Sequence, residues 1–327
     1  MKKLISILLT LVLIFSFASC AQTADNEVNL KEVKANVFGI AGPTGIGLAN
    51  LMKDAKDGNG SLDYNIQLAA SNDEIVAKIT NKEADIAAVA TNLASTLYNK
   101  TNGGVKVLAI NTLGVLNVVA KGVEVTSIAN LKGKTVYSTG QGANPEYILN
   151  NILAGNGLKV GEDVKVEFVS QPAELIAKVV GNKEAVVIAP QPVATTITIQ
   201  DTAAKIVINL NDEWNKFNDK KLVMGCIIAR SEYVEQNPEA VKAFLKDYEA
   251  SIKAVSENID ATAAACEEFK IIPKAPIAKK AIPYCNIVFE DGADMKADLS
   301  AYLDFLFKAN PKSVGGKLPA DDFYYGN

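Results

Sequence analysis

The chain lacks the side chains on which most catalytic and metal-binding sites depend. It has no histidine, and Arg230 is the only arginine among its 33 basic residues. Catalysis by a serine or cysteine paired with histidine is therefore excluded, and so is a metal held by histidine. A cluster of arginines around a phosphate or carboxylate is excluded as well. We expect no catalytic residue, no metal ion and no cofactor. The net charge of −4 argues against a nucleic-acid partner.

Four short loops carry hydroxyl, amide and glycine residues, and each directly follows a predicted strand. In open α/β sheets, ligands bind in the crevice outside such strand ends. Three of the loops lead into helix starts, where free N–H groups and the helix dipole attract an anion. Taken singly these residues fit helix caps, but as a converging set they predict a site for an oxyanion or a polar group. The candidates are Gly42, Pro43, Thr44, Thr91, Asn92, Thr139, Gln141, Gly142, Ala143, Pro190 and Gln191.

Two further residues join these candidates. Asn111 directly follows the strand predicted at 105–110. Trp214 is the only tryptophan, and it either closes over a ligand or anchors a surface loop on the core. Arg230 follows an apolar strand, and we predict that it is a solvated charge at the strand end.

Alternating strands and helices must position these loops. Residues 33–112 predict strands separated by helices, and the pattern restarts at residue 115. Continuous apolar runs such as 84–90 and 185–189 are typical of strands that are buried on both faces of a sheet. A further strand is predicted at 222–229, followed by a tail that is helical to its end. The pattern predicts an α/β protein with two mostly parallel sheets flanked by helices.

The N-terminal segment has the pattern of a bacterial targeting signal. Two lysines precede an apolar run from Leu4 to Ala18, which is short for a membrane span of about 20 residues. The run ends in Phe17-Ala18-Ser19-Cys20, which resembles a lipobox. We therefore predict a signal peptide at 1–19, lipidation of Cys20 and a tether at 20–32. Cleaved secretion without a lipid and an uncleaved anchor are the alternatives.

The remaining cysteines match no metal-binding spacing. Cys226, Cys266 and Cys285 are an odd number, and we interpret them as small buried hydrophobes. A disulfide between Cys266 and Cys285 is the alternative.

Several segments resemble the solute-binding proteins of ABC importers. The segment Leu131-Lys132-Gly133-Lys134-Thr135-Val136, followed by a glycine-rich loop and Pro145-Glu146-Tyr147, resembles their second lobe, in the taurine/nitrate/sulfonate and thiamine-pyrimidine branch. The segment Ile227-Ile228-Ala229-Arg230, followed by Asn237-Pro238-Glu239, fits the same pattern. Gln191 departs from it, because this branch often has an acidic residue between the two prolines. A contact with an amine at Gln191 is therefore in doubt.

This resemblance implies a fold, a mode of action and partners. The fold would be a type II periplasmic-binding-protein clamshell, with lobe I at 33–113 and 229–327 and lobe II at 114–228. Two hinge crossings, near Gly114 and Ala229, would join the lobes. A monomer anchored by lipid outside the bacterial cell membrane, or present in the periplasm, would capture a small organic anion or polar heterocycle. It would deliver that ligand to a membrane permease with its ATPase.

Two other functions remain open at this stage. The chain could be the ligand-binding sensor subunit of a membrane receptor, or an enzyme on the same fold. Pyrimidine synthases related to this branch use histidine and cysteine clusters, which this chain lacks. A menaquinone-pathway lyase would not need a lipobox. Neighbouring genes for a permease and an ATPase would favour import, and a lone sensor kinase would favour signalling.

Overall fold

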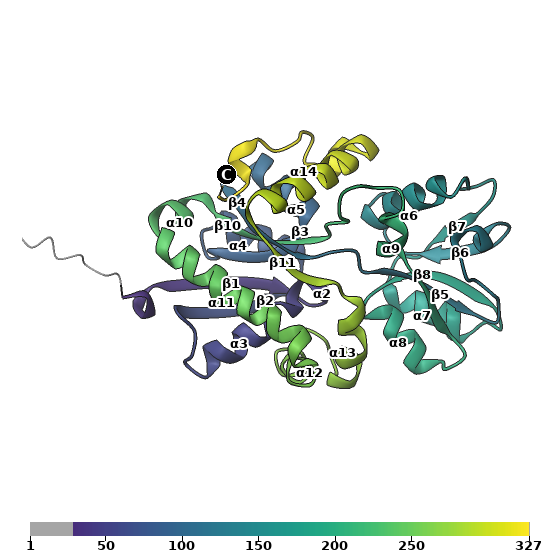
Figure 1. Cartoon of the computed structure of the whole chain (residues 1–327), viewed down its shortest axis with the longest axis horizontal. Helices are drawn as coiled ribbons and strands as arrows, with labels where there is room; N and C mark the ends of the chain where they lie inside the picture. The colour runs from purple at the N-terminus through teal and green to yellow at the C-terminus, as the bar shows by residue number, and fades with distance from the viewer. Residues whose placement is uncertain (1–28, 327) are drawn as a thin grey trace, which may run out of the picture.

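The computed structural model describes residues 29–326. The predicted signal peptide, the lipidation site Cys20 and most of the predicted tether lie outside these residues. Within them, no helix combines the length and the apolar character that crossing a membrane requires. Figure 1 shows two lobes side by side, each built around one sheet.

The sheet of the first lobe has six strands in the order β11-β4-β10-β3-β1-β2. Strand β1 runs parallel to β2 and β3, whereas β10 runs antiparallel to β3 and β4. The strands are β1 (Lys34–Ile40), β2 (Asp63–Ala69), β3 (Ile86–Ala90), β4 (Val105–Thr112), β10 (Gly225–Arg230) and β11 (Ile287–Glu290).

The sheet of the second lobe has five strands in the order β7-β6-β8-β5-β9. Strand β6 runs parallel to β7 and β8, whereas β5 runs antiparallel to β8 and β9. The strands are β5 (Leu116–Lys121), β6 (Thr135–Ser138), β7 (Lys165–Phe168), β8 (Ala185–Pro190) and β9 (Lys205–Asn209).

Helices surround both sheets, and several begin at residues with clear capping chemistry. The Ser71 hydroxyl accepts the Glu74 amide at the start of α4, and Gln171 forms a capping box with Glu174 at the start of α7. The first-lobe helices are α2 (Pro43–Ile46), α3 (Ala49–Lys56), α4 (Asn72–Thr80), α5 (Thr91–Lys100), α10 (Ser231–Gln236), α11 (Pro238–Glu257), α12 (Ile259–Glu268), α13 (Ala275–Ala281) and α14 (Gly292–Ala309). Those of the second lobe are α6 (Asn144–Gly155), α7 (Pro172–Val180), α8 (Val193–Gln200) and α9 (Leu210–Trp214).

Three features differ from the sequence-based expectations. The sheets are mixed. The chain enters the second sheet at β5, coming from the first lobe, and returns to the first sheet at β10, and each of these strands runs antiparallel to its neighbours. The second crossing precedes Gly225, so residues 225–228 belong to the first lobe and not, as predicted, to the second. The tail contributes the edge strand β11, whose four half-buried residues show no alternation from which a strand could be predicted.

One apolar core continues from lobe to lobe. It contains strand residues of both sheets together with Trp214 of α9 and Tyr302 of α14. Two further clusters fill the other faces of the sheets, one in each lobe. The lobes are therefore packed against each other over apolar surface as well as joined by two crossings.

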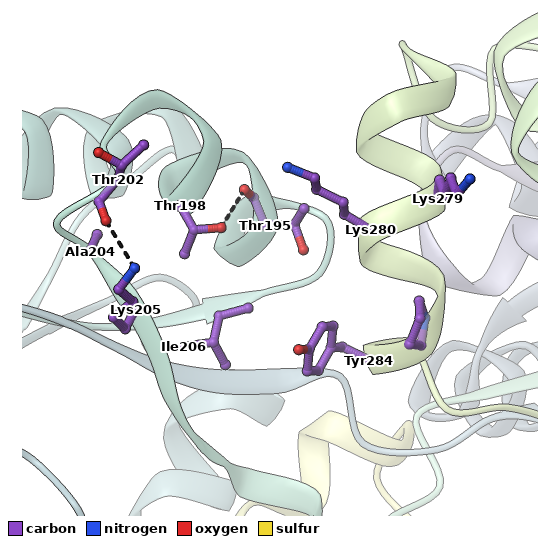
Figure 2. Close-up of a pocket in the computed structure, with 10 residues that line it drawn as sticks. Thr195, Thr198, Thr202, Ala204, Lys205, Ile206, Lys279, Lys280 and Tyr284 are labelled. Atoms are coloured by element: carbon purple, nitrogen blue, oxygen red, sulfur yellow. Dashed lines mark hydrogen bonds between the residues drawn. The ribbon is translucent and has the colours of Figure 1, made fainter.

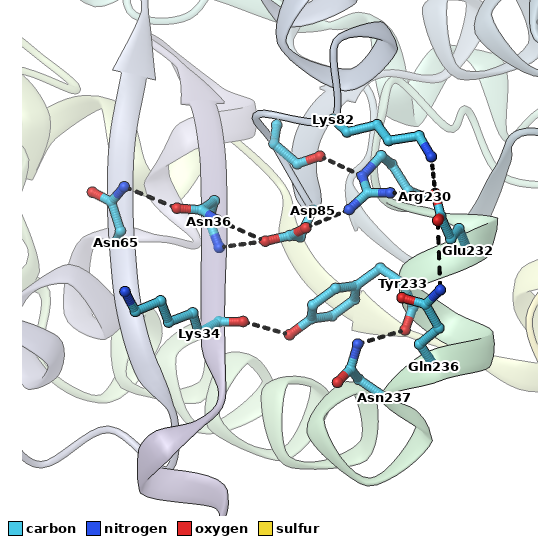
Figure 3. Close-up of polar contacts among 11 residues, drawn as sticks. Lys34, Asn36, Asn65, Lys82, Asp85, Arg230, Glu232, Tyr233, Gln236 and Asn237 are labelled. Atoms are coloured by element: carbon cyan, nitrogen blue, oxygen red, sulfur yellow. Dashed lines mark hydrogen bonds and ion pairs between the residues drawn. The ribbon is translucent and has the colours of Figure 1, made fainter.

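Arg230 forms a buried ion pair instead of the solvated strand end that we predicted. Its guanidinium lies 2.7 Å from Asp85 Oδ1, and its Nε donates to the Ala84 carbonyl at 3.0 Å (Figure 3). Asp85 Oδ2 in turn accepts the backbone and side-chain N–H groups of Asn36, each at 2.9 Å. Because these residues belong to or flank β1, β3 and β10, the network ties three neighbouring interior strands of the sheet together.

The three cysteines of the described chain are buried and unpaired, which confirms our interpretation of them as small hydrophobes. The Cys266–Cys285 disulfide is absent from this structure. Burial raises the pKa of the Cys266 thiol to about 12 and raises the pKa values of Cys226 and Cys285 as well. These thiols are therefore protonated and unsuited to act as nucleophiles.

We predict that Arg230→Met lowers the free energy of unfolding by about 3 kcal/mol, because it leaves the buried Asp85 carboxylate without its counter-charge. Urea denaturation measures this loss. Lys82→Met is the matched control, since it removes an exposed ion pair with Glu232. It should cost less than about 1 kcal/mol. Equal losses of unfolding free energy in the two variants would contradict a larger contribution from the Arg230–Asp85 ion pair.

Candidate ligand site between the two lobes

The N-terminus of α6 lies against the first lobe. Asn144 Nδ2 donates to Asn92 Oδ1 of α5 at 3.4 Å. Three residues further along α6, Tyr147 Oη accepts from Asn310 Nδ2 at 2.9 Å, just after α14. The candidate residue Asn92 therefore lies against the start of α6, which directly follows the loop at 139–143. Both contacts cross between the lobes.

A carboxylate of the protein itself lies beside the loop at 139–143, where the sequence predicted a bound anion. Glu146, in the first turn of α6, accepts the Gly142 amide on Oε2 at 2.6 Å. Tyr147 Oη donates to the Gly142 carbonyl at 2.7 Å. Gln141, Gly142 and Ala143 are exposed, and Thr139 is half-buried. The Glu146 carboxylate competes with an anion for this helix start, so the loop suits a neutral polar group better.

Asn111 supports the first loop instead of facing a ligand. Its side chain is buried, and Nδ2 donates to the Thr44 carbonyl at 3.1 Å and to Tyr248 Oη at 3.0 Å. Its Oδ1 accepts the Thr112 hydroxyl at 3.0 Å. All of its strong donors are used within the protein, so Asn111 holds the Gly42-Pro43-Thr44 loop in place. A Cβ on Gly225 would lie 2.3 Å from Thr44 Cγ2, so only glycine fits behind this loop.

Thr91 fixes the second crossing between the lobes. It is fully buried, and its hydroxyl donates to the Val223 carbonyl at 2.8 Å. Its amide donates to the Met224 carbonyl at 3.3 Å. Neither of our interpretations of Thr91, ligand contact or helix cap, describes this role. The hydroxyl instead connects α5 to a segment more than a hundred residues away in the sequence.

Gln191 has an unused donor deep in the second lobe. Its side chain is 2% exposed, and Oε1 accepts the Thr195 hydroxyl at 2.8 Å. Among the described residues, Nε2 has no hydrogen-bond partner. Gln191 follows the C-terminal end of β8, the position at which ligands bind to such sheets. Pro190 is the last residue of that strand.

Asn117 was missed in the sequence, and it complements Gln191. Asn117 Nδ2 and the backbone N–H of Gln191 both donate to the Val115 carbonyl at 3.0 Å. Within the described chain, the fully buried Asn117 Oδ1 has no partner. An unpaired buried polar group costs about 1–3 kcal/mol, so this donor and acceptor are suited to a molecule that offers the opposite groups. The available signal was a single asparagine within the apolar run of β5.

Trp214 anchors the core, which is the second of our two interpretations. It is 3% exposed, and Nε1 donates to the Lys220 carbonyl at 2.8 Å. Its ring meets Phe305 of α14 edge-to-face at 4.8 Å and Tyr302 at 6.1 Å. Because this face of α14 belongs to the first lobe, Trp214 joins the lobes and is not free to close over a ligand.

A cavity of about 530 Å³ lies between the lobes. Its walls are α8 and β9 of the second lobe and, from the first lobe, α13 with the short helix η4 (Ile282–Tyr284) (Figure 2). Thr195, which hydrogen-bonds Gln191, is one of the lining residues. The volume is in the range of small-molecule sites. The cavity is lined by Thr195, Thr198, Thr202, Ala204, Lys205, Ile206, Lys279, Lys280, Pro283 and Tyr284.

Charged side chains also tie the second crossing to the tail. Lys221 pairs with Glu290 of β11 and lies 3.1 Å from Asp298 Oδ2 of α14. Burial, reinforced by Asp298, raises the pKa of Glu290. Burial also opposes ionisation of Asp298, but hydrogen bonds from Lys221 and Glu290 outweigh it and lower the pKa of that carboxyl. Lys221 therefore compensates two neighbouring carboxyl groups at the boundary between the lobes.

A family model described as menaquinone biosynthesis matches residues 72–294, which is more than half of the chain. No curated protein sequence matches the chain.

Solved structures with similar folds cover most of the chain. An ABC transporter from Parabacteroides distasonis has a TM-score of 0.74 at 21% identity, over 90% of this chain and 98% of that one. The periplasmic aliphatic sulphonate-binding protein of Escherichia coli has a TM-score of 0.68 at 14% identity, over 87% and 96%. The periplasmic nitrate-binding protein of Synechocystis has a TM-score of 0.56 at 17% identity, over 89% and 83%. The fold is therefore the two-lobe type II periplasmic-binding-protein fold, as the sequence resemblance implied.

We predict that Lys221→Met lowers the free energy of unfolding by about 1–2 kcal/mol at pH 8. The loss is smaller than for a fully buried pair because Lys221 is itself half exposed. Without the lysine, the folded-state pKa of Glu290 rises further above its unfolded value, and burial raises that of Asp298 instead of leaving it lowered. The variant therefore regains stability as the pH falls, and the loss should shrink by pH 5. Urea titrations at both pH values measure this. A loss that is independent of pH would contradict the assignment.

Proposed function

The chain belongs to the menaquinone biosynthesis family, and from this membership together with its two-lobe fold we propose that it binds a small polar molecule between its lobes. The observation that carries the proposal is the buried pair of unused groups, Gln191 Nε2 and Asn117 Oδ1, at the strand end where this fold binds ligands. The half-buried Thr44 and Thr139 and the interlobe contact of Asn92 supply further polar groups.

A ligand in this position would couple binding to closure of the lobes. It would contact the second lobe at Gln191 and the first lobe at the α2 and α5 loops. The closed form, in which both sets of contacts are made, binds the ligand more tightly than the open form. This difference in affinity favours closure. This is how a two-lobe binding protein signals occupancy to a partner.

We further propose that the protein is the extracytoplasmic solute-binding component of an importer. Similar folds in an ABC transporter and in sulphonate- and nitrate-binding proteins support this. The lipobox-like segment ending at Cys20 supports attachment to the outer side of the membrane, where a permease with its ATPase would receive the ligand. The ligand would be a small organic anion or a polar heterocycle, with its neutral polar part at the α6 start.

An enzyme of menaquinone biosynthesis is the second candidate, and the family match favours it. Two observations weigh against it. The chain has no histidine, and its three cysteines in the described part are buried with raised pKa values. Acid–base chemistry would therefore fall to carboxylates, tyrosines or lysines. Incubation of the purified protein with menaquinone precursors, followed by mass spectrometry, decides the point, and turnover would replace the binding proposal.

We predict that Gln191→Leu weakens ligand binding while keeping the empty protein folded. Leucine fills a similar volume and removes the unpaired buried donor, but it also removes the acceptor of the Thr195 hydroxyl, so the melting temperature without ligand should change little. Native mass spectrometry identifies co-purifying compounds, and a thermal-shift screen of sulfonates, carboxylates, pyrimidines and flavin-like compounds identifies binders. A binder of the native protein should lose at least tenfold in affinity.

Gln236→Leu, at an exposed position of α10 outside the candidate ligand residues, is the matched control and should bind as well as the native chain. Undiminished binding by Gln191→Leu would place the site elsewhere.

The lipid anchor has its own test. Cys20→Ser removes the thiol that would carry the lipid, so we expect that this variant neither incorporates palmitate nor stays on washed membranes. The native chain expressed in a bacterium should incorporate palmitate and stay on washed membranes. Equal palmitate incorporation in the two proteins would contradict the anchor without affecting the ligand site.

A further inference from the structure

The cavity between α8 and α13 has a charge opposite to that of the protein as a whole. The chain has four more acidic than basic residues. Three lysines and no aspartate or glutamate line this cavity. The three lysine side chains are exposed, and an anion in the cavity would relieve the repulsion between those that have no carboxylate partner. The charge of the lining therefore points to an anionic occupant.

Two of the three lysines are available for such an occupant. Lys279 is neutralised by Asp260, with Nζ 2.5 Å from Oδ1. Within residues 29–326, neither Lys280 nor Lys205 takes part in an ion pair, and Lys205 Nζ donates only to the Thr202 carbonyl at 3.0 Å. In Figure 2, Lys280 extends from α13 across the cavity toward Thr195, whereas Lys279 points away from it. Two uncompensated ammonium groups match the charge of one dianion.

The two available lysines come from different lobes. Lys280 belongs to α13 of the first lobe, and Lys205 begins β9 of the second. Tyr284, which follows Lys280 by one helical turn, points its hydroxyl into the same space (Figure 2). The Thr195 and Thr198 hydroxyls already donate, to Gln191 Oε1 and to the Thr195 carbonyl. The tyrosine and the two lysines are therefore the main donors.

We propose that this cavity binds a tetrahedral oxyanion dianion, of the phosphate or sulfate class, which bridges Lys280 and Lys205 and so stabilises the closed arrangement of the lobes. The site is separate from the proposed ligand contacts at Gln191 and Asn117, because neither of these residues lines the cavity and its charged donors come from α13 and β9. The anion then regulates closure. Its site uses charged donors, whereas the proposed ligand site uses the neutral amide groups of Gln191 and Asn117.

Thermal-shift and calorimetric titrations with sodium phosphate and sodium sulfate test the site, in a buffer free of both and at constant ionic strength set with chloride. Either oxyanion should raise the melting temperature of the native chain, and chloride should not. The two titrations distinguish phosphate from sulfate as the preferred anion. No response beyond that to chloride would overturn the proposal.

Three methionine variants locate the response. Lys280→Met and Lys205→Met should each weaken oxyanion binding at least tenfold, because each removes one of the two charges. Lys279→Met is the matched control, since that lysine lines the cavity but is paired with Asp260, and it should weaken binding less than threefold. Equal effects of all three would indicate general surface charge and would overturn the bridging site.

A further readout tests whether the anion joins the lobes. Phosphate should slow hydrogen exchange in both α8 and α13 of the native chain and in neither helix of Lys280→Met. Gln191→Leu should respond to phosphate like the native chain, which separates failure of this proposal from failure of the ligand site. Loss of the phosphate response in Gln191→Leu would overturn the proposal of a separate site.

Discussion

The chain passes between the lobes twice, and the rest of the structure depends on how those crossings are held. The first, before β5, and the second, before β10, lie side by side. A Cβ on Gly114 would lie 2.7 Å from Leu222 Cδ2 and 2.9 Å from Asn211 Cβ, so a larger residue there would have to displace both side chains. The Thr91 hydroxyl holds the second crossing at Val223, and Lys221 ties it to Glu290 and Asp298. β10, which follows the second crossing, lies between β3 and β4 in the first sheet and pairs with both.

Polar groups near the crossings therefore fall into two sets. In one set, including Thr91 and Asn111, each donor has a protein partner, and the side chain serves to position a loop or a crossing. In the other, Gln191 Nε2 and Asn117 Oδ1 are buried and unpaired within the described chain. Burial without a partner is costly. The second set is for that reason more informative about ligand binding than the more exposed residues of the glycine-rich loop.

The family and the fold point to related but different activities. The family model names a biosynthetic pathway, whereas similar solved structures include an importer component and binding proteins for sulphonate and nitrate. One two-lobe architecture can serve both, since closure over a small molecule is useful for capture and for excluding water during a reaction. What distinguishes the two is the set of side chains in the site. In this chain that set is rich in amides and hydroxyls and has no histidine.

The sequence by itself determined the two α/β units, most strands and the loops that follow them, because hydrophobic periodicity and capping residues act within a few positions of the chain. It also determined that recognition must proceed without histidine and with a single arginine. Only the tertiary structure decided that Arg230 pairs with the buried Asp85, that Trp214 joins the lobes and that β11 completes a sheet. It likewise decided which amides remain free and brought Lys205 and Lys280 to one cavity. These outcomes depend on partners far apart in the sequence, and a polar side chain is available to a ligand only when no such partner satisfies it.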